Sequence, residues 1–344
     1  MLLFSVGPRS HQPRGNKQVL FSDPLTPRLP SASSKQIYNN IMATSKKTSS
    51  SRTSLAFPPA LSDYPAGSWV MTVLFLSAMV WGWVLSWLAQ VLFSCSVGWF
   101  MRSKTRLQSW QGYWFRLFSA KMTMTVVPGL SIRKTSSSWQ APKEVLMGEK
   151  AVLVVANHRS FLDPFALGAS LFPLECKYVA KADLFKVPFG GWAMCRPGDL
   201  AVKFDKNRNQ GWGTVKGSTG ELLRLAAEQL SSGNSVAIYP EGTRMGYSPE
   251  KSLEAKGCGV MNFKPAFFDL AKKLDVPIVC VAMKGTDDAW PVGSNMLRPA
   301  SILVDVSEPM LPADYDSDVA LADAARNNLG AMYTKLCQNN TKAD

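Results

Sequence analysis

The sequence predicts an α/β domain with a mainly parallel sheet and flanking helices, preceded by an N-terminal helical segment that anchors the chain in a membrane. Three observations support this prediction. From residue 151 onward, short β-branched runs alternate with stretches of helical periodicity, the pattern of parallel strands joined by helices. Residues 69–100 contain no charged side chain. Two polar motifs each come directly after a strand-like run.

The first 66 residues are rich in Ser, Pro, Lys and Arg and poor in acidic residues. This composition is typical of disordered segments, and transit peptides share it. We therefore interpret residues 1–66 as a disordered or targeting tail. Met42 would also serve as a start, so the sequence leaves open whether the tail is an address or a passive extension.

We interpret residues 67–130 as the membrane anchor. The uncharged run 69–100 exceeds the about 20 apolar residues of a spanning helix, so it crosses the bilayer or re-enters it. Tilt, a break near Gly82 or a re-entrant hairpin would accommodate its extra length. Residues 107–127 place Trp, Tyr, Leu and Phe at helical spacing. This stripe indicates an amphipathic helix that lies in the membrane interface or faces the protein core. Residues 131–143, rich in Ser and Lys, are expected to form a linker.

The net charge of +13 is unevenly distributed. Residues 101–143 hold eight Lys or Arg and no acid, whereas residues 144–344 are nearly neutral. Such a pattern favours a membrane surface as partner and argues against a nucleic-acid-binding domain. The basic flank after residue 100 places the globular part of the chain on the cytoplasmic or stromal side. The six cysteines form no CxxC motif, so we expect reduced thiols and neither disulfides nor a metal site.

Residues 145–340 are expected to form the globular domain. The strand-like runs are 151–156, 177–180, 200–204, 235–239, 277–283 and 301–306, and the helix-like runs lie near 164–171, 217–231, 263–273 and 318–338.

The first polar motif follows the strand-like run 151–156. His158 lies in the turn that leaves this strand, and Asp163 stands at the start of the next helix, where Asp is a favoured N-cap. A strand–turn–helix corner can fold His158 back onto Asp163. A carboxylate beside one imidazole nitrogen fixes the tautomer and raises the basicity of the other. We therefore predict a general-base pair. The alternative is a structural His that caps the loop, and the only other histidine, His11, lies in the tail.

The second polar motif, Tyr239-Pro240-Glu241-Gly242-Thr243-Arg244, follows the strand-like run 235–239. It should lie at the same edge of the sheet as His158, beyond the carboxyl ends of the strands, where α/β proteins bind ligands. Gly242 permits a tight turn or close approach to a ligand. The planar fork of Arg244 suits a phosphate, and Glu241 could hold this Arg or a substrate hydroxyl. Alone, the motif could equally be a surface turn.

Together the two motifs, NHRSFLD at 157–163 and YPEGTR at 239–244, resemble the signature blocks of the membrane glycerolipid acyltransferases, above all the 1-acyl-sn-glycerol-3-phosphate acyltransferases. Residues 181–198 and 263–279 look like two further blocks, and all four stand in the order of the family. The resemblance covers roughly residues 145–310.

The resemblance implies transfer of a fatty acyl chain from acyl-CoA, or from an acyl-carrier protein, to the free hydroxyl of 1-acyl-sn-glycerol 3-phosphate (lysophosphatidic acid), which yields phosphatidic acid. His158 would be the general base and Asp163 would orient it. The residues that would hold the phosphate-bearing acceptor are Glu241, Gly242, Thr243, Arg244, Lys203 and Lys264. No cofactor or metal is implied, since acyl-CoA is a co-substrate, and the lipid bilayer is the other partner.

Several alternatives remain open at this point. The acceptor could be another lysophospholipid or glycerol 3-phosphate, or the chain could be a catalytically silent lipid-binding scaffold. A lipid hydrolase is a further candidate, although the nucleophile-elbow motif GxSxG is missing. Phe204 stands where the second block of the family usually has a phosphate-binding Arg, and Lys203, Lys206 or Arg208 would have to replace it. We expect the endoplasmic reticulum membrane, with the site facing the cytosol, and the plastid envelope as the alternative.

Overall fold

The computed structural model describes residues 64–65, 67–135, 138–205, 213–214, 217–246, 255 and 259–340. The chain divides into two units, Met1–Ser54 and Leu55–Asp344. The first unit lies outside the described residues, as does almost all of the predicted tail 1–66.

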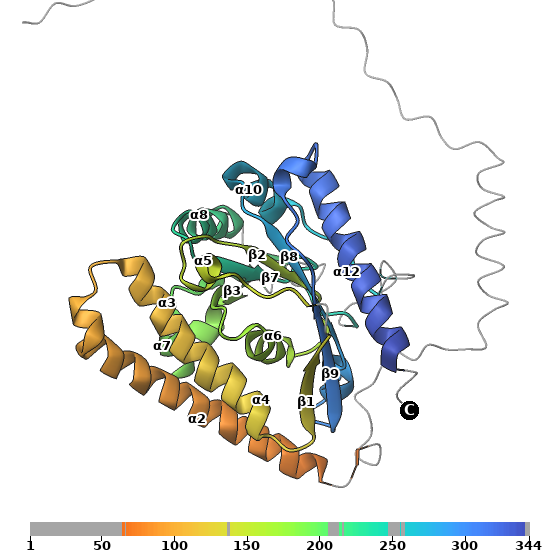
Figure 1. Ribbon diagram of the computed structural model, residues 1–344. Coiled ribbons are helices and arrows are strands. Elements are labelled where there is room, and N and C mark those ends of the chain that lie inside the picture. Colours follow the sequence, from red (N-terminus) through yellow and green to blue (C-terminus); the bar gives the residue numbers. More distant parts are fainter. Residues whose placement is uncertain are drawn as a thin grey trace, which may run out of the picture. The chain divides into compact units, whose positions relative to one another are not determined.

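A seven-stranded sheet forms the centre of the domain, in the order β1-β9-β8-β2-β7-β3-β4 (Figure 1). Its strands are β1 (Leu130–Lys134), β2 (Leu153–Ala156), β3 (Cys176–Lys181), β4 (Leu200–Val202), β7 (Ser235–Ile238), β8 (Ile278–Lys284) and β9 (Ala300–Val306). Neighbouring strands are parallel except β8 and β9, which are antiparallel. The predicted α/β class with a mainly parallel sheet is confirmed.

Two short stretches differ from the strands that the sequence predicts. Leu130–Lys134 is not part of a linker but the edge strand β1, paired in parallel with β9. Leu130 is buried and Ile132 half-buried, whereas Ser131, Arg133 and Lys134 are exposed. Exposed edge strands commonly carry such charged residues. Because of this composition, the sequence alone predicts a linker for this segment. The expected strand 200–204 ends at Val202, and β5 (Phe204–Asp205) pairs instead with β6 (Gly213–Thr214).

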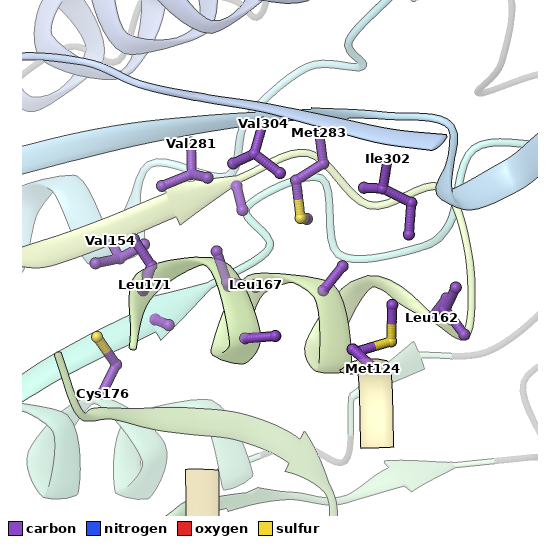
Figure 2. Close-up of a cluster of buried hydrophobic side chains, with 14 of the residues drawn as sticks. Met124, Val154, Leu162, Leu167, Leu171, Cys176, Val281, Met283, Ile302 and Val304 are labelled. Carbon is purple, nitrogen blue, oxygen red and sulfur yellow. The ribbon is translucent and has the colours of Figure 1, made fainter. Parts of the chain in front are cut away.

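Helices cover both faces of the sheet (Figure 1). They are α5 (Lys143–Leu146), α6 (Asp163–Leu171), α7 (Gly190–Cys195), α8 (Ser218–Ser231), α10 (Ala266–Leu274), α11 (Thr286–Ala289) and α12 (Asp318–Asn340), with short 3-10 turns η4 (Ala182–Lys186) and η5 (Pro312–Asp314). The four residues of β2 are fully buried and alternate between the faces: Val154 packs in the cluster with α6, and Val155 packs in the cluster with α8, α10 and α12. Figure 2 shows Leu167 of α6 in the first cluster. Burial of each such side chain contributes about 1.5–3 kcal/mol.

A helical hairpin precedes the sheet. It consists of α2 (Ser68–Cys95), the 3-10 turn η2 (Val97–Phe100) and a return run made of α3 (Lys104–Phe115), the π-helical η3 (Arg116–Met122) and α4 (Thr123–Val126). The return run lies beside α2 (Figure 1). No break occurs at Gly82. A Cβ atom there would lie 2.6 Å from the carbonyl oxygen of Phe118, so this glycine lets the two helices approach closely.

The side of α2 that packs against the rest of the chain is rich in small and polar residues. Its buried residues are Ser68, Met71, Thr72, Phe75, Met79, Gly82, Ser86 and Gln90. Large apolar side chains, among them Trp69, Leu76, Trp81 and Leu92, are exposed on the other side. The amide of Gln90 donates to the carbonyl oxygens of Gln111 and Ala193, each at 2.9 Å. By length and composition α2 could cross a membrane.

The return run, like α2, buries polar side chains against the domain and leaves aromatic side chains accessible. Its predicted aromatic stripe is half-buried or exposed, as Trp110 shows with 45 % of its surface accessible. Arg116, which lies off that stripe, is buried against the domain. Its Nη2 lies 2.6 Å from Asp199 Oδ1 and donates to the carbonyl oxygen of Cys176 at 2.8 Å. The hairpin therefore buries polar groups beside apolar residues such as Phe75 and leaves other large apolar side chains exposed on its outer side.

Candidate active site

His158 and Asp163 meet at the carboxyl end of β2. The strand ends at Ala156, a six-residue loop follows, and α6 begins at Asp163. The Nδ1 atom of His158 lies 2.7 Å from Asp163 Oδ2. The same oxygen accepts the backbone N–H groups of Arg159 at 2.6 Å and Ser160 at 2.8 Å. Asp163 is the first residue of α6 rather than its N-cap, and its carboxylate faces back into the loop, where it fixes both the imidazole and the main chain.

The imidazole of His158 is held in one orientation. Asp163 holds one side of the ring, and the ring of Tyr239 stacks on its face with a centroid distance of 4.3 Å and an interplanar angle of 20°. The side chain of His158 remains 21 % exposed. Within the described part of the chain, its Nε2 has no hydrogen-bond partner. A nitrogen so placed, opposite a carboxylate-bound Nδ1, can accept a proton from a group that enters the site.

Glu241 joins the two motifs. β2 and β7 pair in parallel, with Val155 opposite Ile238, so both loops leave the sheet at the same edge. Glu241 is buried; its Oε1 accepts the N–H of His158 at 2.7 Å, and its Oε2 accepts that of Met261 at 3.1 Å. Burial raises the pKa of this carboxyl to about 7, against the opposing effect of the two N–H groups. Both oxygens thus bind main chain, and Glu241 fixes the His158 loop.

The turn after Glu241 lies against the same loop. Gly242 adopts a φ of 70°, a region that favours glycine. A Cβ atom here would lie 2.7 Å from Lys264 Nζ, so the Lys264 side chain crosses this turn. Arg244 and Thr243 are half-buried in the turn. The next residue, Met245, donates its N–H to the carbonyl oxygen of His158 at 2.8 Å. The structure therefore brings Gly242, Thr243, Arg244 and Lys264 together beside His158.

Lys203 lies apart from this group. It follows the last residue of β4, which is separated from β2 by β7 and β3. Three strand spacings of about 4.8 Å place the ends of β2 and β4 ~14 Å apart. Phe204 packs at the edge of the cluster with α8, and Lys206 and Arg208 lie outside the described residues. A contact between Lys203 and an acceptor phosphate stays a prediction.

Two residues next to His158 contribute more than the sequence indicated. Asn157 is fully buried and forms two hydrogen bonds with the main chain of Met283, at 2.9 and 2.8 Å. Arg159 pairs with Asp287 at 2.8 Å and lies over the ring of Tyr333. Both residues stand next to His158 in the first motif, and this position was the one indication in the sequence that they belong to the site. Their partners lie far along the chain, so their roles could not be assigned from spacing.

Residues 135–284 match the family model described as Acyltransferase. This segment of the chain is therefore similar to the acyltransferase family. Over 181 residues it is 33 % identical to a 1-acyl-sn-glycerol-3-phosphate acyltransferase of Chlamydomonas reinhardtii, a match that covers 52 % of this chain and 47 % of the relative. A chloroplastic enzyme of the same name from Brassica napus is 31 % identical over 179 residues, covering 51 % and 44 %. The chain spans about half the length of these curated relatives.

The fold of this chain also resembles a solved structure. The crystal structure of the 1-acyl-sn-glycerophosphate acyltransferase PlsC from Thermotoga maritima matches with a TM-score of 0.54 and 21 % sequence identity. The match covers 78 % of this chain and 95 % of that structure. The predicted resemblance to the glycerolipid acyltransferases is confirmed at the level of family and fold.

Proposed function

We propose that this acyltransferase domain moves a fatty acyl chain from acyl-CoA to the free hydroxyl of 1-acyl-sn-glycerol 3-phosphate and so makes phosphatidic acid. The observation that carries the proposal is the 2.7 Å contact of His158 Nδ1 with Asp163, which leaves Nε2 directed away from the carboxylate at the carboxyl edge of the sheet. The names of the relatives from Chlamydomonas reinhardtii and Brassica napus support this choice of acceptor.

In this mechanism, Nε2 of His158 takes the proton of the acceptor hydroxyl while the hydroxyl oxygen attacks the thioester carbonyl. The C–S bond then breaks, the acyl chain stays on the acceptor oxygen, and the CoA sulfur leaves and takes up a proton from the imidazolium. Asp163 stabilises the imidazolium during this cycle. A thioester is reactive enough for positioning and one base to suffice, so the proposed scheme uses no cofactor, metal or covalent enzyme intermediate.

Recognition of the acceptor phosphate is assigned to Arg244 and Lys264. Arg244 offers a planar, bidentate donor set, and Lys264 adds a point charge across the Gly242 turn. Glu241, together with Gly242 and Thr243, shapes this turn. Glu241 does so through its backbone contacts and not as a direct ligand in the proposed scheme. Lys203 would reach only a distant part of a bound substrate.

The test is a His158→Ala variant assayed in nanodiscs with one acyl-CoA and a panel of lysophospholipids and glycerol 3-phosphate. We expect at least about a 10²–10⁴-fold loss of kcat, the usual contribution of general acid–base catalysis, with an unchanged melting temperature. His11→Ala, the other histidine of the chain, is the matched control. Retained turnover in His158→Ala would remove this imidazole from the mechanism. The panel separates the proposed acceptor from other acceptors, and an inactive wild-type chain would favour a scaffold.

We further propose that the outward apolar face of the hairpin lies in the endoplasmic reticulum membrane with the active site facing the cytosol. The exposed Trp69, Leu76, Trp81 and Leu92 of α2 support a membrane contact along this face. The chloroplastic relative makes the plastid envelope the alternative. A fluorescent fusion of the chain, with and without residues 1–41, distinguishes the two. Plastid location that depends on 1–41 would overturn the endoplasmic reticulum assignment.

A further inference from the structure

A second polar pocket lies between the hairpin and the edge of the sheet. Its volume is about 380 Å³, and its walls come from η3, α4, β1 and the end of α6. α6 has nine residues, so Asp163 at its start lies ~12 Å along the helix axis from the end that borders this pocket. None of the His158 site residues lines it. The pocket is therefore separate from the candidate active site.

Two lysines are the charged residues of this pocket, Lys121 from η3 and Lys134 from β1. Across the described residues, no carboxylate forms an ion pair with Lys121, Lys134 or the neighbouring Arg133. Partial burial, and then the charge of Lys121, lower the pKa of Lys134. Two positive charges therefore share one concave site with no carboxylate paired to either, and a bound anion would stabilise this arrangement.

The hydroxyl groups of the pocket already have acceptors for their protons. Thr125 donates to the carbonyl oxygen of Lys121, and Ser170 donates to that of Leu167. Ser131 donates to Ser301 Oγ. The two ammonium groups are therefore the hydrogen-bond donors that a ligand would meet. This donor set, two cations and no acid, is suited to phosphate.

The rest of the wall is apolar. It includes Met124, Leu130, Ile132 and Phe172. The volume falls in the usual range for small-molecule sites, about 300–1,000 Å³, and is larger than a phosphate group alone needs. A ligand that carries a phosphate on an apolar body would satisfy both kinds of wall.

We propose that the Lys121–Lys134 pocket is a second anion site, which binds a phosphate group with an attached apolar portion. A phosphate-monoester lipid in the bilayer and free phosphate share the chemistry that the two lysines recognise. The site is independent of the acyl transfer proposed above, because it shares no residue with the His158 site.

The test measures the rate at which an amine-acetylating reagent labels individual lysines of the full chain, read by mass spectrometry. The chain is placed in phosphatidylcholine nanodiscs alone, in nanodiscs that also contain phosphatidic acid, or in phosphatidylcholine nanodiscs with added inorganic phosphate. We expect Lys134 and Lys121 to be labelled about tenfold more slowly when the free ligand is ten times its Kd. The exposed Lys143 and Lys150 are internal controls and should keep their rates.

Variants decide whether the pocket itself is responsible. Lys121→Gln should abolish the protection of Lys134. Arg133→Gln removes the same charge from the same strand at a position that does not line the pocket, and should preserve the protection. Protection by phosphatidic acid alone assigns the site to a lipid, and protection by inorganic phosphate as well assigns it to the phosphate group. Equal slowing of Lys143, no slowing of Lys134, or loss of protection in Arg133→Gln would overturn the proposal.

Discussion

Two buried aspartates hold two regions of this chain, and they differ in the partner that each holds. Asp163 contacts the ring of His158, an imidazole that remains partly exposed. Asp199 binds Arg116, a permanent cation that is itself buried. The comparison teaches that a buried carboxylate can support proton transfer, as proposed for Asp163, only when its partner is an exposed group able to carry a proton. Otherwise it fastens one part of the fold to another.

The surroundings of the two aspartates extend this contrast. Around Asp163, the sheet and α6 contribute apolar side chains to the core, such as Leu162 and Leu167 (Figure 2). Around Asp199, the hairpin brings polar groups inward, including Arg116 and Gln90. Apolar burial therefore orders the sheet, whereas the hairpin is attached both by apolar side chains such as Phe75 and by specific hydrogen bonds and an ion pair.

The largest effect is expected for Asp163→Asn. The amide cannot stabilise an imidazolium, so kcat should fall by about 10²–10⁴-fold. Stability should change little, because the amide oxygen can still accept a backbone N–H. Steady-state acyl transfer and thermal melting of the same preparation measure both quantities. A variant with a lower melting temperature but unchanged turnover would show that Asp163, like Asp199, has only a structural role.

The second effect concerns Arg116→Met. Removal of one member of a buried ion pair leaves the other charge uncompensated and costs about 3–5 kcal/mol. We expect a lower free energy of unfolding and faster proteolysis within the hairpin. Arg106→Met is the matched control, since Arg106 is exposed on the same helical run and has no ion pair among the described residues. Equal melting temperatures for the two variants would show that the Arg116–Asp199 pair does not hold the hairpin.

The smallest effect concerns Glu241, a buried carboxyl between these two extremes. Its folded-state pKa of about 7 lies above the ordinary 4.5, so between these pH values the folded chain retains a proton that the unfolded chain has released. The stabilisation is fully present below the unfolded pKa and is lost as the pH rises through 7. It amounts to about 3 kcal/mol.

Glu241→Gln should remove this pH dependence. Apparent free energies of unfolding at pH 5 and pH 8 would then differ by about 2–3 kcal/mol less in the variant than in the wild-type chain. Denaturant titrations in the same detergent provide the measurement. Parallel pH profiles for the two chains would show that the Glu241 carboxyl titrates near its ordinary pKa.

Local spacing predicted the centre of the site, and long-range contacts could not be predicted. His158 and Asp163 are five residues apart, so a strand–turn–helix corner was enough to join them. The hold of Glu241 on Met261 and that of Asn157 on Met283 depend on how distant loops meet at the sheet edge. The order of the strands in the sheet could not be predicted either, because the alternation of strands and helices along the chain indicates parallel pairing but not which strands are neighbours.

The hairpin shows a different limit. Hydrophobicity located α2 but did not reveal which side would pack inward, because apolar residues surround most of this helix. The aromatic stripe excluded Arg116, and its burial is explained by Asp199 and the carbonyl oxygen of Cys176, which the sheet brings close. The edge strand β1 was hidden because its sequence mixes apolar residues with Ser, Arg and Lys.

The main chain around His158 is tied on both sides of the ring. Glu241 holds its N–H, Met245 holds its carbonyl oxygen, and Asn157 anchors the residue before it. In the proposed mechanism, a substrate would therefore have to adapt to a base that is fixed in place. If the proposed function holds, attempts to change the acceptor should leave this loop untouched and vary the walls around it, since a change within the loop would move the proposed base as well.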